Sequence, residues 1–220
     1  MTSVADYAKR RMMMVDTQVR PSDVTKFPII DAMLHVPREQ FVPPAQREAA
    51  YIGENLPLGG NRVVLEPRTL AKLLDGLALG PRDVVLDIGC GLGYSTAVLS
   101  RMVDFVVGLE DDADRAAEAQ ATLSGSGIDN AAVLEGPLAE GAARNGPYDA
   151  IVIEGAVERL PEAIVDQLNE GGRLACLFGE GAMCEARIGV KADGRIGWRS
   201  SFNAAAPLLT GFEKQDVFAL

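Results

Sequence analysis

The sequence predicts an α/β fold, in which a largely parallel sheet carries helices on both faces. From residue 82 onward, short apolar runs of strand type alternate with helical patterns, which is typical of a parallel sheet. Near the end of the chain, Asp193-Gly194 lies between two strand-like runs and indicates a hairpin. We therefore expect residues 1–80 to form a helical N-terminal lobe and lid. Residues 81–220 should form the sheet core with a C-terminal antiparallel strand pair, in one compact unit overall.

The N-terminal third predicts helices followed by a long loop. Residues 1–30 carry a broad apolar face, and Pro21 should break them into two helices. Residues 29–34 read as a short helix. Turn formers without a clear period fill residues 50–67, so we expect a loop that covers a site as a lid. Residues 68–79 then form a helix with its leucines on one face.

The elements of the core alternate without an internal repeat. Glycine pairs and a Gly-Ser-Gly run mark several of the helix ends. The predicted strands are 84–88, 105–109, 131–134, 150–153 and 173–178, the predicted helices are 94–102, 112–124 and 161–168, and the strand pair is 185–190 with 198–202.

Composition excludes several classes of function. The 220 residues are 48% hydrophobic, which is enough for a full core. No apolar run reaches the ~18 residues of a membrane helix. The formal net charge of −10 repels phosphate, so we expect no nucleic-acid partner. One histidine and three cysteines without ligand spacing predict no metal site. The N-terminus lacks a secretory pattern, so we expect a cytoplasmic protein.

A glycine-rich turn after the first core strand is the strongest motif. Gly89, Gly91 and Gly93 follow Asp87, and glycines there let a ligand approach the backbone and the N–H groups of the next helix. The next strand ends at Glu110, about 20 residues beyond the turn, where a carboxylate suits a ribose diol. The spacing differs from the G-x-G-x-x-G dinucleotide fingerprint. Ligands of such sheets bind beyond the carboxyl ends of the strands.

This combination resembles the Rossmann-like S-adenosylmethionine-dependent methyltransferases. The resemblance implies S-adenosylmethionine as the cofactor, with Asp87 near its methionine end and Glu110 on its ribose. The residues that we expect to bind it are Asp87, Gly89, Cys90, Gly91, Gly93, Glu110 and Gly136.

Further motifs along nearly the whole chain resemble the protein-L-isoaspartate O-methyltransferases. They are Val36-Pro37-Arg38-Glu39-x-Phe41-Val42-Pro43, Leu56-Pro57-Leu58-Gly59, Gly146-Pro147-Tyr148-Asp149 and Gly171-Gly172-Arg173-Leu174. The resemblance implies methylation of isoaspartyl carboxylates in damaged proteins, as a repair step. A carboxylate is already a nucleophile at neutral pH, so such an enzyme mainly aligns the reactants and excludes water.

Two stretches depart from the family pattern. The family lid reads Gly-x-Gly-Gln-Thr-Ile-Ser-Gln-Pro, with its serine at the methyl-acceptor site, and the matching stretch is 59–67. Leu65 stands at the serine and cannot donate a hydrogen bond to a carboxylate. Arg62 or Arg68 could bind the carboxylate instead, although we expect both at the surface. After the third strand, residues 136–138 replace the family's Gly-Asp-Gly.

The altered lid leaves three hypotheses for the function. The chain is a repair methyltransferase, a methyltransferase of the same fold with a small-molecule acceptor, or a non-catalytic S-adenosylmethionine-binding module. No catalytic residue is assigned, and the oligomeric state and the lid conformation stay open. The candidates for the acceptor-side wall are Leu58, Gly59, Leu65 and Glu66.

Overall fold

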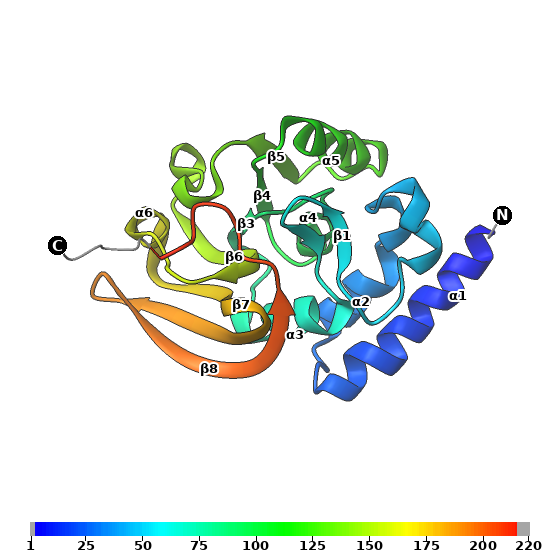
Figure 1. Cartoon of the computed structure of the whole chain (residues 1–220), viewed down its shortest axis with the longest axis horizontal. Helices are drawn as coiled ribbons and strands as arrows, with labels where there is room; N and C mark the ends of the chain where they lie inside the picture. The colour runs from blue at the N-terminus through cyan, green and yellow to red at the C-terminus, as the bar shows by residue number, and fades with distance from the viewer. Residues whose placement is uncertain (1–2, 215–220) are drawn as a thin grey trace.

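The computed structural model describes residues 3–214 and contains a six-stranded sheet in the order β5-β4-β3-β6-β7-β8. Neighbouring strands from β5 to β7 run parallel, and β8 pairs antiparallel with β7. The α/β fold class predicted from the sequence is therefore confirmed (Figure 1). The strands are β3 Val84–Ile88, β4 Phe105–Glu110, β5 Ala131–Glu135, β6 Tyr148–Val157, β7 Leu168–Ala192 and β8 Arg195–Ala206.

The helices lie close to their predicted positions. Ser3 caps α1 through a capping box with Asp6, and α1 continues into a π-helical turn and a 3₁₀ turn that contains Pro21. The helices are α1 Val4–Met14, α2 Phe27–His35, α3 Pro67–Leu77, α4 Tyr94–Ser100, α5 Ala113–Gly125 and α6 Glu162–Asp166.

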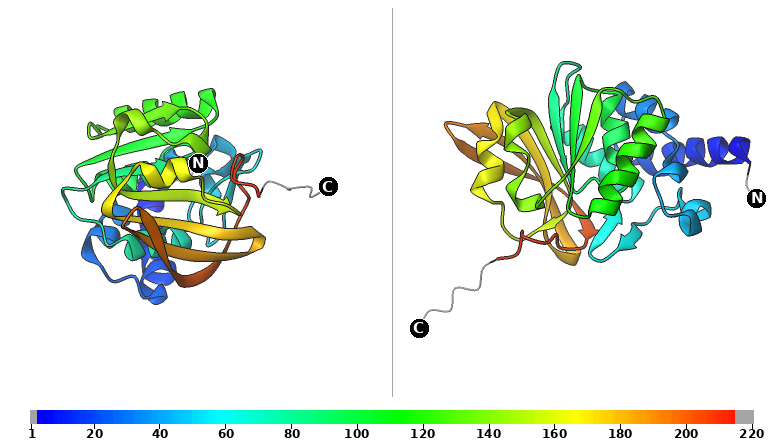
Figure 2. Two further views of the ribbon diagram at one scale, coloured as in Figure 1. Left: turned by 90° about the vertical axis from the view of Figure 1, so that its left-hand side faces the viewer. Right: turned by 90° about the horizontal axis from the view of Figure 1, so that it is seen from above.

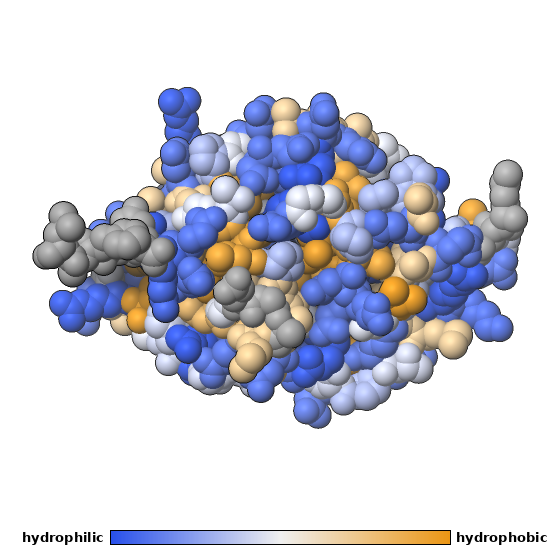
Figure 3. Space-filling model, in the orientation of Figure 1, coloured by the Kyte–Doolittle hydropathy of each residue, from blue (hydrophilic) through white to orange (hydrophobic). Residues whose placement is uncertain are grey.

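The central strands are apolar on both faces, as expected for a parallel sheet covered on both sides. Val85 and Val106 share one hydrophobic cluster with the N-terminal helices, α3, α4 and α5. Their neighbours Leu86 and Val107 point to the opposite face, where α6 and the C-terminal segment cover them. Figure 2 shows helices on both sides of the sheet, and Figure 3 shows apolar residues gathered at the centre of a mostly polar face.

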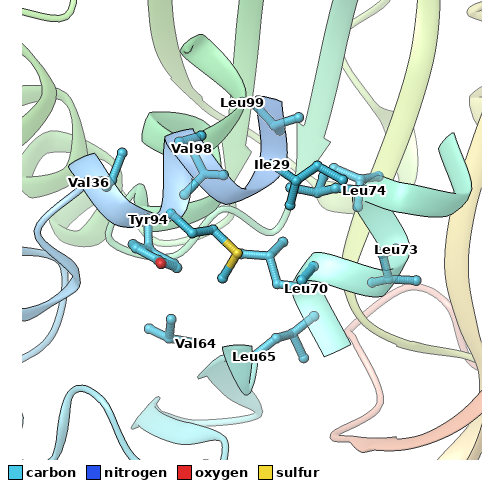
Figure 4. Packing of buried hydrophobic residues seen from close by; sticks show 14 of the residues in the cluster. Ile29, Val36, Val64, Leu65, Leu70, Leu73, Leu74, Tyr94, Val98 and Leu99 are labelled. Carbon is cyan, nitrogen blue, oxygen red and sulfur yellow. The ribbon is translucent and has the colours of Figure 1, made fainter. Parts of the chain in front are cut away.

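The first of these clusters crosses the boundary predicted at residue 80. Leu70 and Leu74 of α3 pack with Tyr94 and Val98 of α4, and Ile29 of α2 joins them (Figure 4). The N-terminal lobe and the sheet thus share one core. The division into 1–80 and 81–220 stays a prediction.

The loop expected over residues 50–67 contains a β-hairpin, so that expectation was wrong in part. Strands β1 Leu56–Gly59 and β2 Arg62–Val64 pair antiparallel. Gly59 and Gly60 have φ values of +93° and +57°, so glycines occupy a turn that other residues rarely adopt. The hairpin gives the lid a defined shape.

The C-terminal half of the sheet also differs from the prediction in one respect. The runs 173–178 and 185–190, expected as separate strands, belong to one strand, β7. The predicted hairpin is confirmed, because Ala192 pairs with Arg195 across Asp193 and Gly194. Both turn residues have positive φ, at 51° and 73°, as a tight two-residue hairpin turn requires.

Two further findings concern the described residues. Within 3–214, no helix has the length and apolar character needed to span a bilayer. The same residues contain no cluster of three or more side chains that could hold a metal ion.

Candidate functional site

The glycine-rich turn connects β3 to α4 and lies beneath the β1–β2 hairpin. Gly89 and Gly91 have φ values of +79° and +58°. A Cβ at Gly89 would lie 2.7 Å from Nη2 of Arg62, and one at Gly91 would lie 2.6 Å from Cδ1 of Leu58. The positive φ values favour glycine at both positions, and the hairpin, which we call the lid (residues 56–64), lies close over the turn.

The N–H groups of the turn are already used within the protein. That of Gly91 donates to the Glu110 carboxylate at 2.8 Å. The other bonds run from Gly89 and Cys90 to the Leu109 carbonyl at 2.7 and 3.2 Å, and from Gly93 to the Cys90 carbonyl at 2.9 Å. These four amides bond to neighbouring protein groups and do not face a ligand, whereas the expectation that N–H groups of the next helix, α4, meet a ligand stays a prediction. What the turn offers a ligand is close approach to the backbone.

Cys90 contributes its backbone to the turn and turns its side chain away. A Cβ at Gly108 of β4 would lie 3.1 Å from the Cys90 sulfur, so the thiol packs against that strand. Burial raises the pKa of the Cys90 thiol well above its ordinary value, so it is neutral.

Glu110, at the end of β4, is the most heavily bonded carboxylate of the site. It is fully buried and accepts hydrogen bonds from Nη2 of Arg62 at 2.8 Å, Nε of Arg115 at 3.0 Å and the N–H of Gly91. Burial by itself would raise the pKa of Glu110, but the charge and hydrogen bonds of Arg62, together with Asp111 and Arg115, lower it to about 2. The carboxylate is therefore ionised at neutral pH.

Arg62 lies inside the site, so the expectation that it is exposed was wrong. Only 4% of its surface is exposed, because its guanidinium reaches across from the lid to Glu110. Arg68 keeps 39% of its side-chain surface exposed and pairs with Glu66 at 3.6 Å.

Asp87, at the carboxyl half of β3, uses one carboxylate oxygen and leaves the other unbonded. Its Oδ2 accepts hydrogen bonds from Ser95 at 2.7 Å and Thr96 at 2.6 Å, at the start of α4. Its Oδ1 is buried and has no hydrogen-bond partner among the described residues. Burial, opposed by those two hydrogen bonds, raises the pKa of Asp87 to about 6.

Glu154, near the carboxyl end of β6, is a further buried carboxyl, and no role was assigned to it from the sequence. It is 4% exposed, and its Oε1 has no hydrogen-bond partner within the part of the chain that the structure describes. Burial, reinforced by the charge of Asp87, raises the pKa of Glu154 well above its ordinary value. The signal that marks it is a single acid near the carboxyl end of an apolar strand.

A cavity of about 580 Å³ opens at the carboxyl ends of β4 and β5, where Leu109, the residue before Glu110, lines it. Its walls include Leu109, Leu134, Gly136, Pro137 and Asn145. The N–H of Gly136 donates to the Glu110 carbonyl at 3.0 Å, which ties this wall to β4. The volume lies within the range of small-molecule sites.

The four candidates for the acceptor-side wall have different surroundings in the structure. Leu58 lies over Gly91, and Gly59 belongs to the turn of the lid. Leu65 is 1% exposed and packs in the core with Leu70 and Tyr94 (Figure 4). Glu66 starts α3 and accepts a hydrogen bond from Thr69 at 2.6 Å. Their role as a wall stays a prediction.

Arg38 gives the Val-Pro-Arg-Glu motif a structural role, which could not be assigned from the sequence. It is fully buried and donates to the carbonyls of Ala50 at 2.7 Å and Leu65 at 2.8 Å. Its guanidinium also lies 4.6 Å from the centre of the Tyr94 ring. Arg38 therefore fixes the base of the lid against α4.

The chain matches a family model over residues 9–205, described as protein-L-isoaspartate(D-aspartate) O-methyltransferase. A protein-L-isoaspartate O-methyltransferase of Pelobacter propionicus is 34% identical over 198 residues, covering 90% of this chain and 88% of the relative. One from Koribacter versatilis is 33% identical, covering 86% of each.

Two solved structures share the fold. A protein-L-isoaspartate O-methyltransferase superposes with a TM-score of 0.78 at 24% identity, covering 93% of this chain and 66% of the other. A Plasmodium falciparum protein with the same description, in complex with S-adenosyl-L-homocysteine, superposes with a TM-score of 0.76 at 21% identity, covering 92% of this chain and 97% of the other.

Proposed function

The chain belongs to the protein-L-isoaspartate O-methyltransferase family, and we propose that it binds its cofactor at the carboxyl ends of β3, β4 and β5. It is an S-adenosylmethionine-dependent O-methyltransferase that methylates isoaspartyl carboxylates of damaged proteins, a reaction of protein repair.

The observation that carries the proposed site is Glu110, a buried ionised carboxylate at the end of β4 that accepts a hydrogen bond from the glycine turn. A carboxylate in this position suits the two hydroxyls of the cofactor's ribose. The cavity bordered by Gly136 would take the adenine, and the unbonded Oδ1 of Asp87 would face the methionine end. Gly89 and Gly91 leave room for close approach, so the residues present fit S-adenosylmethionine once the lid gives way.

When bound, S-adenosylmethionine supplies a methyl group activated by its sulfonium. The acceptor carboxylate is ionised at neutral pH, so the chain need not provide a base. Its residues instead position the reactants and keep water away, and the lid over Gly89 and Gly91 suits that purpose. Arg38 supports the lid by holding the Leu65 carbonyl. We also propose a reducing compartment, the cytoplasm, because Cys90 and Cys176 are buried free thiols.

The test of the function is transfer of a labelled methyl group from S-adenosylmethionine to an isoaspartyl peptide, with the matching aspartyl peptide as control. We expect methylation of the isoaspartyl peptide alone. Methylation of neither peptide, in a sample that binds S-adenosylhomocysteine by calorimetry, would contradict the isoaspartyl acceptor.

The test of the ribose assignment is the affinity of E110Q for S-adenosylhomocysteine. Loss of charge-assisted hydrogen bonds to the ribose should weaken binding about tenfold. The matched control is E118Q, which removes an exposed carboxylate from the outer surface of α5. Equal affinity of E110Q and E118Q would refute the role of Glu110.

A further inference from the structure

We propose that the guanidinium of Arg62 in the lid binds the carboxylate at the methionine end of S-adenosylmethionine. The proposal rests on the cofactor site proposed above and adds a ligand-binding residue from outside the glycine turn. Four observations support it: an unbonded nitrogen, its position, the bonding of Glu110, and the residue type.

The guanidinium of Arg62 has one nitrogen to spare. Its Nη2 and Nε lie 2.8 and 3.4 Å from the two oxygens of Glu110. Its Nη1 is buried and has no hydrogen-bond partner in the described part of the chain. A buried charged donor without a partner is costly, and a ligand carboxylate would satisfy it.

The spare nitrogen lies beside the turn at which the methionine end is expected. A Cβ at Gly89 would lie 2.8 Å from Nη1 of Arg62. Asp87, two residues before Gly89, has the unbonded oxygen Oδ1. The site thus offers one unpaired cationic donor and one unpaired anionic acceptor around the same glycine. An amino-acid head group carries the complementary pair, with its ammonium suited to Asp87 and its carboxylate to Arg62.

The bonding of Glu110 requires an exchange of partners when ribose binds. Glu110 accepts two hydrogen bonds from Arg62, one from Arg115 on α5 and one from the Gly91 backbone, so its four acceptor sites are occupied. Arg62 is the donor that the lid carries, and it can leave when the lid shifts. If the guanidinium breaks its contact with Glu110 but stays buried in the site, it needs another anion as a partner, because an unpaired buried charge is costly. Asp111, 3.9 Å from Nε of Arg62, is partly exposed, whereas the methionine carboxylate arrives with the ribose itself.

The residue type departs from the family pattern. In the aligned lid stretch, 59–67, Arg62 stands where the family pattern has glutamine, which carries no charge. R62Q is therefore a conservative variant with the family's own residue. R115Q is the matched control, because Arg115 also donates to Glu110 but approaches from α5.

The experiment compares two ligands by calorimetry with the full chain. One is S-adenosylhomocysteine, and the other is its decarboxylated analogue, which keeps the adenosine, the sulfur and the ammonium. The wild type should prefer the carboxylated ligand by about tenfold or more, as a charge-assisted hydrogen bond implies. In R62Q the preference should fall to about twofold or less, whereas R115Q should keep the wild-type preference. Thermal unfolding of each variant confirms that it is folded.

The outcomes separate this proposal from the proposed function. A wild-type preference that R62Q retains would overturn the role of Arg62 and leave the cofactor site intact. So would a raised KM for the isoaspartyl peptide in R62Q with an unchanged ligand preference, because Arg62 would then bind the acceptor carboxylate. Failure of the wild type to bind either ligand would overturn the cofactor site itself.

Discussion

Replacing Glu110 by glutamine should destabilise the folded protein by about 3 kcal/mol at neutral pH. The substitution keeps the size of the side chain and removes its charge. Arg62, 4% exposed, would lose the anion that lies 2.8 Å from its Nη2. Arg115 would lose its contact at 3.0 Å as well, although it keeps its pairs with Asp111 and Asp112.

Two estimates of the magnitude agree. Removing one member of a buried ion pair costs about 3–5 kcal/mol, and glutamine, which still accepts hydrogen bonds, belongs at the lower end. Independently, the pKa of Glu110 falls from 4.5 to about 2 on folding, which corresponds to about 3 kcal/mol of free energy in favour of the ionised folded state.

The assay is urea unfolding of the wild type, E110Q, R62Q and the double variant. Because Glu110 and Arg62 are in contact, the double variant should lose less stability than the sum of the single variants. D111N is the control: Asp111 is partly exposed and lies 3.9 Å from Arg62, so its loss should cost about 1 kcal/mol or less.

The pH dependence of the stability difference between the wild type and E110Q provides the decisive test. A folded pKa below the unfolded value means that the stabilisation is present above about pH 4.5 and is lost as the pH falls toward 2. The gap between wild type and E110Q should therefore narrow below pH 4.5. A gap under 1 kcal/mol at pH 7, or one that widens in acid, would show that Glu110 and Arg62 do not form a buried pair.

Three further predictions concern Leu65 and Arg38, at the base of the lid, and Glu154 of β6. L65S should lower the free energy of unfolding by about 2–4 kcal/mol without raising methyl transfer, since Leu65 is 1% exposed; higher activity at unchanged stability would place it at the acceptor. R38M should cost about 2–4 kcal/mol in thermal unfolding, because two buried carbonyls lose their donor, and wild-type stability would contradict this. The pKa of Glu154 is raised in the folded protein, so the stability of the wild type should fall relative to that of E154Q as the pH rises from 5 to 8. A rise in relative stability over this range would contradict the burial of a neutral Glu154.

The sheet core could be predicted because its signals are local. Val84–Ile88 is bounded by a turn on each side, and its predicted limits agree with the structure. The Asp193-Gly194 hairpin follows from two residues that tolerate positive φ. Such patterns require no knowledge of distant contacts.

The lid could not be predicted in the same way, because its structure depends on distant partners. Turn formers in 50–67 are compatible with both an irregular loop and a hairpin, and the choice depends on packing over Gly89 and Gly91. Arg62 reads as a surface residue in its own segment. Its burial depends on Glu110, 48 positions later in the chain, which no local pattern reveals.

The charges of the site link the lid to Glu110, which the family pattern, with a neutral glutamine at the position of Arg62, does not imply. A neutral lid residue, such as the family's glutamine, leaves Glu110 without a cation from the lid. In this chain Arg62 supplies that cation, so opening of the lid and ionic bonding of Glu110 are coupled. Any ligand that occupies Glu110 must then overcome the Arg62 contact or offer Arg62 another anion. Substitutions in this lid should therefore change cofactor affinity as well as acceptor choice.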